Sequence, residues 1–197
     1  MNILAPIFHD CSSLSLGLLC ARSGLLTGFD VRYWAIRIAA TKMRARLMNY
    51  FIRPATPDDI NKIIEFTTQE AQESEGSVID LVAVERGVSS AFSENPRSKY
   101  WVMEDSSGTV IANTSVVKEW SDFHGNDYWW IKSFYIAPEH RGMGLADELI
   151  KHLIKEAKSE KALELRLYVH GDNGRAIRAY ERCGFIESPY TIMKVGL

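Results

Sequence analysis

The chain has 197 residues, 46% of them hydrophobic, and a formal net charge of −2 at pH 7. This length and composition predict one globular domain with a sizeable buried core. The nearly neutral charge argues against nucleic acid as a partner, and no apolar run approaches the ~20 residues that a bilayer-spanning helix needs. Three scattered cysteines exclude a disulfide framework or a zinc site. We therefore expect a cytoplasmic protein without a metal.

Residues 1–47 differ in composition from the rest of the chain. They carry six Lys or Arg against two Asp, and a basic amphipathic stretch follows a Ser- and Leu-rich start. Three interpretations are open: a targeting segment, a basic helix on a membrane or partner surface, or the product of an upstream start codon. We favour a dispensable or disordered extension with a non-native start, because a strand-like sequence follows Met48 at once. The predicted globular domain is then 48–197.

Apolar strands and amphipathic helices alternate from Met48 onward. In chain order we expect a strand at 50–55, helices at 57–73 and 78–92, hairpin strands at 99–105 and 110–120, a strand at 127–137, a helix from 145, a strand at 162–170, a helix at 173–183 and a strand at 189–197. Antiparallel strands followed by strand-helix-strand units indicate a mixed sheet with helices on both faces. The fold class is therefore α/β of the mixed α+β kind.

Residues 141–146, Arg-Gly-Met-Gly-Leu-Ala, form a glycine-rich turn between a predicted strand and a predicted helix. Glycines let a ligand approach the backbone closely, and the amides at a helix start attract anions. This pattern predicts a phosphate or pyrophosphate site; a plain tight turn is the alternative. A Walker loop is excluded because Gly-Lys-Ser/Thr is absent. A dinucleotide-binding fold is excluded because Asp147 stands where the third glycine belongs and too few residues follow.

Two motifs in this order resemble those of the GNAT family of N-acetyltransferases. R-x-x-G-x-A at 141–146 matches the family motif Q/R-x-x-G-x-G/A, and N-x-x-A-x-x-x-Y-x-x-x-G-F at 173–185 matches its second motif. The resemblance covers roughly residues 50–196. It implies a mostly antiparallel central sheet of six to seven strands. It also implies an enzyme that transfers an acetyl group from acetyl-CoA to a primary amine of a small molecule or protein, by direct attack in a ternary complex.

The resemblance also implies which residues bind acetyl-CoA, in a V-shaped gap between the strand ending at Ile136 and the strand of 165–169. The pantetheine arm would pair with the backbone of Phe134, Tyr135 and Ile136 like an added strand. Arg141 opens the loop and either braces it or meets a phosphate. Asn173 caps the next helix and, in the family, also bonds the pantetheine arm. The pyrophosphate would rest on the amides of the loop and helix start: Gly142, Met143, Gly144, Leu145, Ala146 and Asp147.

Tyr180 is the candidate catalytic acid, since the departing sulfur of CoA needs a proton or a hydrogen bond and a phenol can supply it at neutral pH. The alternative is that Tyr180 is only a core residue of one helix face. Cys183 invites a ping-pong mechanism, but no histidine lies nearby in sequence. We therefore interpret Cys183 as a small buried hydrophobe.

The attacking amine must lose a proton, so the enzyme needs a base. Where some family members carry a glutamate, this sequence has Trp130 and Tyr168. We take Glu119 as the candidate base, with Asp122 and His124 as alternatives. The glutamates at 70, 73 and 75 near the end of the first helix are interpreted as a solvated face.

The acceptor side of the sequence is rich in aromatic residues. An aromatic and acidic wall suits a cationic amine; its candidates are Trp101, Trp120, Phe123, Tyr128, Trp129 and Trp130. Alternation along a strand sends the last two to opposite faces. The rival hypothesis is a catalytically inactive CoA-binding regulatory module. A membrane-associated enzyme rests only on the basic 1–47 segment, and a homodimer remains open.

Overall fold

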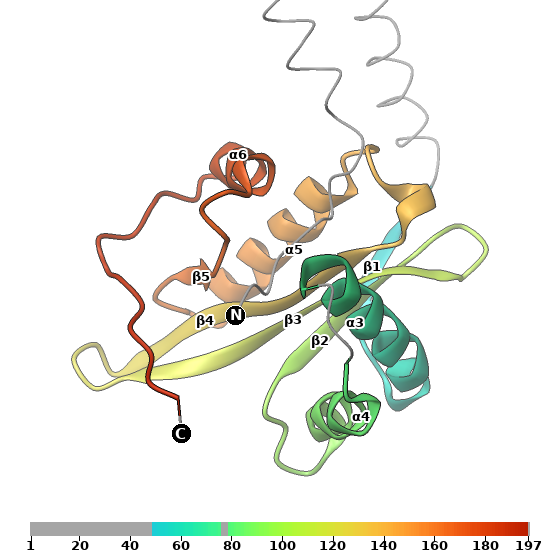
Figure 1. The fold of residues 1–197 in the computed structure, drawn as a ribbon, viewed down its shortest axis with the longest axis horizontal. Helices are drawn as coiled ribbons and strands as arrows, with labels where there is room; N and C mark the ends of the chain where they lie inside the picture. The colour runs from blue at the N-terminus through green and yellow to red at the C-terminus, as the bar shows by residue number, and fades with distance from the viewer. Residues whose placement is uncertain (1–48, 76–78, 197) are drawn as a thin grey trace, which may run out of the picture.

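The computed structural model describes residues 49–75 and 79–196, so the predictions for residues 1–47 lie outside it. The elements are β1 (Phe51–Pro54), η1 (Pro57–Asp59), α3 (Ile60–Glu75), α4 (Leu81–Ser89), η2 (Ser90–Phe92), β2 (Lys99–Glu104), β3 (Val110–Ser121), β4 (Asn126–Ile136), η3 (Pro138–His140), α5 (Leu145–Ser159), β5 (Leu165–Leu167) and α6 (Gly174–Arg182). Figure 1 shows the arrangement of these elements. None of the helices in this part of the chain is both long and apolar enough to span a bilayer.

One sheet with the order β1-β2-β3-β4-β5 forms the centre of the molecule. The first four strands are antiparallel to their neighbours, and β5 runs parallel to β4. The predicted mixed sheet is therefore confirmed. The predicted number of six to seven strands is wrong, because the described residues form five.

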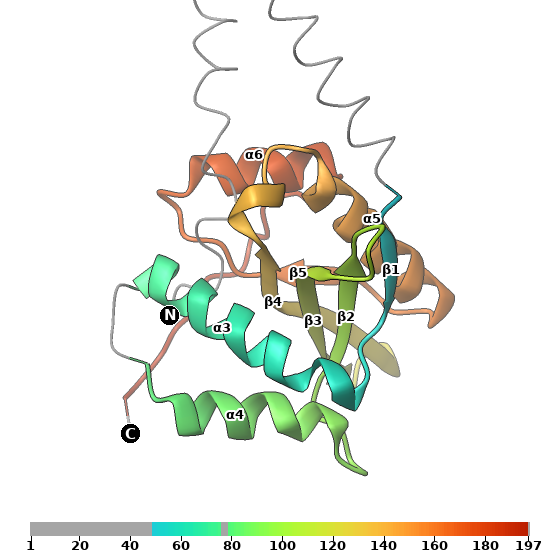
Figure 2. The same cartoon turned by 90° about the vertical axis from the view of Figure 1, so that its right-hand side faces the viewer.

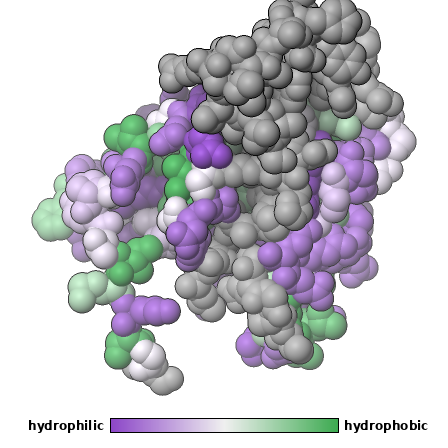
Figure 3. All heavy atoms as spheres, turned by 45° about the horizontal axis from the view of Figure 1, so that its top comes forward, coloured by the Kyte–Doolittle hydropathy of each residue, from purple (hydrophilic) through white to green (hydrophobic). Residues whose placement is uncertain are grey.

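The missing strand is the one expected at 189–197. Residues 189–196 form no strand, and the apolar side chains of Tyr190 and Met193 are exposed. Figure 3 shows apolar side chains along this C-terminal segment, at the lower left of the view. An alternating apolar pattern makes a strand only when a sheet edge pairs with it, and β5 pairs over three residues only.

Helices cover both faces of the sheet, as predicted (Figure 2). On one face, α5 packs through Leu149, Ile150 and Leu153 against strand residues that include Trp101 and Trp129, and α6 joins the same cluster. On the other face, α3 and α4 pack against β2 in a smaller cluster. The two predicted neighbours Trp129 and Trp130 do lie differently: Trp129 is buried beneath α5, whereas Trp130 is half-buried and stacks on Tyr168.

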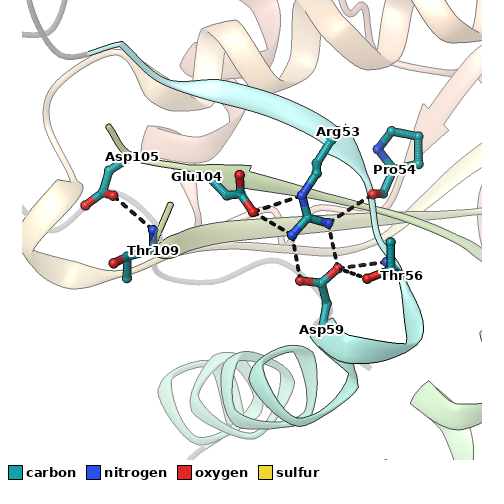
Figure 4. Close-up of polar contacts among 7 residues, drawn as sticks. All are labelled: Arg53, Pro54, Thr56, Asp59, Glu104, Asp105 and Thr109. Atoms are coloured by element: carbon teal, nitrogen blue, oxygen red, sulfur yellow. Dashed lines mark hydrogen bonds and ion pairs between the residues drawn. The ribbon is translucent and has the colours of Figure 1, made fainter. Parts of the chain in front are cut away.

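A buried carboxylate fixes the start of α3 to the sheet edge (Figure 4). Asp59 accepts hydrogen bonds from the Arg53 guanidinium at 2.7 and 2.9 Å and from the Thr56 backbone amide at 2.7 Å. Arg53 also pairs with Glu104 of β2. The hydrogen bonds from Arg53, partly opposed by burial, lower the pKa of Asp59. These contacts connect β1, β2 and the first turn before α3, and so set the direction in which α3 crosses the sheet.

Candidate active site

The carboxyl-terminal half of β4 lies open on the side that faces β5. β5 pairs with β4 only through Trp129–Ile131, whereas β4 continues to Ile136 and stays paired with β3. Beyond Ile131, no strand of the described chain covers the outer edge of β4 (Figure 1). Backbone groups on such an edge can pair with an extended ligand. Phe134, Tyr135 and Ile136 lie on this open stretch.

A β-bulge changes which face the side chains of β4 point to. Between Ile131 and Ser133 the register against β3 shifts, so β4 carries one extra residue, Lys132. As a result, Ile131 and Phe134 both pack in the core beneath α5 although three positions separate them. Ser133 points to the opposite face, where it contacts α3. The bulge therefore brings a serine hydroxyl and the open edge of β4 to the same helix.

The glycine turn joins η3 to the start of α5. Gly142 and Gly144 have φ angles of 77° and 84°, which favour glycine, and Gly144 is the N-cap of α5. A Cβ built on either glycine would meet no other atom of the described residues within 4 Å, so these residues leave the space beside the turn open. Leu145 and Ala146 are buried and hold the helix start in place. The first amides of α5 have no acceptor within the helix, and its macrodipole favours an anion there.

Arg141 braces the turn from its inner side. Its Nε donates to the Ile136 carbonyl oxygen at 2.7 Å, and its Nη2 lies 3.0 Å from the Glu73 carboxylate of α3. The guanidinium also lies over the Tyr135 ring, whose hydroxyl donates to Glu73. The Arg141 side chain is 5% exposed. Of the two roles open from sequence, these contacts support bracing.

The second motif lies on α6. The Asn173 side chain accepts a hydrogen bond from the Ala176 amide at 3.0 Å, so it caps the helix as predicted. Tyr180 is buried in the same core cluster as Phe134 and Ile136. Its hydroxyl has no hydrogen-bond partner among the described residues. Burial and then the negative charge of Glu70 raise the pKa of Tyr180, so the hydroxyl keeps its proton at neutral pH.

Cys183 packs at the margin of that core. Burial raises the pKa of its thiol, which disfavours the thiolate that a nucleophilic cysteine requires. The structure therefore supports its interpretation as a small hydrophobe.

Glu70 of α3 is buried, and its prediction as part of a solvated face is wrong. The side chain accepts hydrogen bonds from the Ser133 hydroxyl at 2.9 Å and the Phe134 backbone amide at 3.2 Å. Burial raises the pKa of Glu70 to about 8, the charge of Glu73 adds to the rise, and the two hydrogen bonds oppose it. Ile63, Phe66 and Glu70 follow one another at spacings of three and four, so Glu70 continues the buried stripe of α3. That spacing was the signal in the sequence.

Glu119 lies at the other end of the β3–β4 hairpin. It is exposed, pairs with Tyr128 across the strands and accepts a hydrogen bond from the Trp130 indole. Ser115, which pairs with Ser133, is four residues away, or about 13 Å along an extended strand. Glu119 therefore does not join the open stretch of β4 in this structure.

Basic side chains of the protein itself already lie over the aromatic rings near Glu119. Arg166 lies 3.4 Å from the centre of the Tyr128 ring, and Lys132 lies 4.9 Å from that of Tyr168. This arrangement does not support the expected aromatic wall for a cationic acceptor. The remaining aromatics also differ from the expected wall: Trp101 is buried in the core, while Trp120 and Phe123 are exposed near the hairpin turn.

The geometry thus brings together the open edge of β4, the glycine turn and Tyr180, and leaves Glu119 apart from them. A scan against family models matches residues 47–185 to the acetyltransferase (GNAT) family. The chain belongs to this family. Members are enzymes that transfer acyl groups, and the family assignment suggested by the two motifs is confirmed.

Two curated relatives are mycothiol acetyltransferases. The one from Corynebacterium aurimucosum is 28% identical over 109 residues, and the one from Mycobacterium sp. (strain JLS) is 27% identical over 115 residues. These matches cover 54% and 56% of this chain and 36% of each relative. The chain therefore spans about a third of the length of the curated relatives it matches.

A solved structure supports the fold over nearly its whole length. A possible acetyltransferase from Clostridium difficile 630 superposes with a TM-score of 0.70 at 28% identity, covering 75% of this chain and 97% of that one.

Proposed function

We propose that the protein is an N-acetyltransferase that uses acetyl-CoA and acts by direct attack of a primary amine in a ternary complex. The observation that carries the proposal is that the open edge of β4, the glycine turn before α5 and the buried hydroxyl of Tyr180 adjoin a single core cluster. Acetyl-CoA has one group for each feature: a polar arm for the edge of β4, a diphosphate for the glycine turn and a thioester for the Tyr180 hydroxyl.

The residues present fit acetyl-CoA. The backbone of Phe134–Ile136 would hold the pantetheine arm, because no strand of the described residues pairs with the outer side of that stretch of β4. The amides of Gly142–Asp147 would hold the diphosphate, because two glycines and the start of a helix leave open space and positive potential there. Asn173, which caps α6 through its side-chain oxygen, would also contact the arm.

Tyr180 would serve as the acid. Its hydroxyl is protonated, buried and without a partner in the described chain, so it can donate a hydrogen bond or a proton to a departing thiolate. A buried hydroxyl without a partner normally destabilises a fold, and function is one reason to retain it.

The acceptor is proposed as a primary amine of a small molecule or a protein. The curated relatives are named for mycothiol acetylation, and their names support acetyl transfer as the reaction. A catalytically inactive CoA-binding module is the second candidate, because Trp130 and Tyr168 occupy two positions where the resemblance places a glutamate.

Thiol release from acetyl-CoA across a panel of amines tests the proposal. Calorimetry with CoA shows first whether the folded protein binds the co-substrate. Binding together with amine-dependent thiol release supports the enzyme. Binding without release on any amine supports the inactive module, and no binding contradicts both.

A further inference from the structure

Glu70 is a buried acid that neither motif explains, and its position relative to β4 is unusual. Its two hydrogen bonds come from Ser133 and from the Phe134 amide, both on the stretch of β4 that β5 leaves open. The carboxylate therefore lies against the stretch of backbone proposed to hold the pantetheine arm. We propose that Glu70 is the general base that removes the proton from the attacking amine, an assignment that rests on the proposed function.

No cation among residues 49–75 and 79–196 forms an ion pair with Glu70. The ion pairs found in the described part of the chain include Glu73, Glu104 and Glu160, but not Glu70. A buried carboxylate that lacks a cationic partner is costly to keep and commonly marks a functional site. Only 5% of the surface of Glu70 is exposed. If Glu70 only accepted a hydrogen bond from Ser133, a neutral side chain could accept that bond equally well.

The titratable groups that act on Glu70 are all acids. Burial raises the pKa of Glu70 to about 8, and the charge of Glu73 on the same helix adds to the rise. Burial is also the main cause of the raised pKa of Tyr100 on β2 and of Tyr180 on α6; the charge of Glu70 adds to both, so it lies within electrostatic reach of the two phenols. A base with a pKa near neutrality accepts an amine proton more readily than an ordinary carboxylate does.

The other acids are poorly placed for this step. Glu73 is engaged by Arg141 and by the Tyr135 hydroxyl. Glu119 lies about 13 Å along β3 from Ser115, the residue that pairs with Ser133. Asp122 is exposed and accepts a hydrogen bond from the Trp120 indole.

The proposed step balances in atoms and charge. The amine nitrogen forms a bond to the thioester carbonyl carbon, and the carbon–sulfur bond breaks. The proton leaving the amine goes to the Glu70 carboxylate, and the sulfur receives a proton from the Tyr180 hydroxyl. Return of the proton from Glu70 to the Tyr180 phenolate, directly or through water, restores both groups and leaves an amide and a free thiol.

Glu70→Gln tests the assignment, with Glu65→Gln as a matched control on the exposed face of the same helix. The acceptor is whichever panel amine gives the fastest thiol release with the wild-type protein. We expect Glu70→Gln to lower kcat/KM by about 100- to 10,000-fold, the usual contribution of a general base. Its affinity for CoA, measured by calorimetry, should be retained, and Glu65→Gln should match the wild type in both measurements.

The pH profile separates a base from a structural residue. The ratio of kcat/KM between wild type and Glu70→Gln cancels the titration of the amine itself. That ratio should rise with pH and level off near pH 8, because Glu70 works only when it is deprotonated. A ratio that does not change with pH would overturn the assignment.

Glu70→Asp covers the case in which Glu70→Gln fails to fold, because it keeps the carboxylate and shortens its reach. We expect a smaller loss than in a neutral variant, with the pH-dependent limb preserved. Activity of Glu70→Gln close to wild type, or the large loss appearing in Glu119→Gln instead, would overturn the inference and leave the proposed function intact. Failure of the wild type itself to release thiol with any amine would overturn the proposed function and this step together.

Discussion

At the open end of β4, the carboxylate of Glu70 is buried and receives hydrogen bonds from a serine hydroxyl and a backbone amide. At the other end of the same hairpin, the carboxylate of Glu119 is exposed and receives one from an indole. Both side chains are glutamates that contact β4, and burial raises the pKa of the first to about 8. The comparison shows that removal from water, more than residue type or position in a motif, decides which acid can act as a base near neutral pH.

The largest expected effect comes from the glycine turn, and the other end of the hairpin supplies its control. Gly144→Val should weaken CoA binding by at least about 100-fold, or about 3 kcal/mol, because a branched side chain would fill the open space beside the amides. Gly125, in the turn between β3 and β4, also has a positive φ and open space around it. Gly125→Val should show similar backbone strain without a loss of CoA affinity; equal losses in the two variants would contradict a phosphate site at Gly144.

The next effect separates catalysis from stability at Tyr180. Tyr180→Phe should lower kcat by about 10- to 100-fold, since only the proton donor is lost. The same change removes a buried hydroxyl that has no partner in the described chain, so the free energy of unfolding should stay equal or rise by about 1 kcal/mol. Steady-state kinetics measures the change in kcat, and thermal unfolding measures the change in stability. A variant that becomes less stable and loses CoA affinity would indicate a purely structural tyrosine.

A further effect is a pH dependence of stability at Glu70. The pKa of Glu70 is raised from 4.5 to about 8, so between these values the folded chain keeps a proton that the unfolded chain releases. The contribution of Glu70 to stability is therefore present at low pH and declines as pH rises toward 8, by at most about 1.4 kcal/mol per pH unit.

Glu70→Gln should thus gain stability relative to wild type when the pH is raised from 5 to 8, as measured by chemical denaturation. Parallel curves for Glu70→Gln and wild type would show that the carboxyl is not protonated in the folded protein.

Local patterns in the sequence were sufficient for the turn, the helices and the hairpin. The positive φ angles at Gly142 and Gly144 and the cap at Asn173 follow from residues adjacent in the chain, so spacing alone predicts them. The role of Arg141 did not follow, because its partner Glu73 is 68 residues away. The last strand was overpredicted for a related reason: a strand needs a partner edge, which no local pattern reports.

Glu70 shows how a general rule can hide a specific signal. A run of glutamates near a helix end is normally solvated, yet the spacing from Ile63 through Phe66 places Glu70 on the buried stripe. The bulge that points Ser133 at it depends on the register between β3 and β4, and a single sequence does not reveal that register. The position of Glu70 therefore needed the structure, whereas the glycine turn did not.

The extra residue in β4 has a consequence for how this chain can vary in length. Deleting Lys132 would restore regular alternation and keep every side chain from Ser133 to Ile136 on its present face, because Ile131 and Ser133 already pair with adjacent residues of β3. Phe134 would stay beneath α5, and Ser133 would stay on the face of α3. Shortening by one residue at the bulge would thus remove the local bend of β4 and leave its two faces as they are.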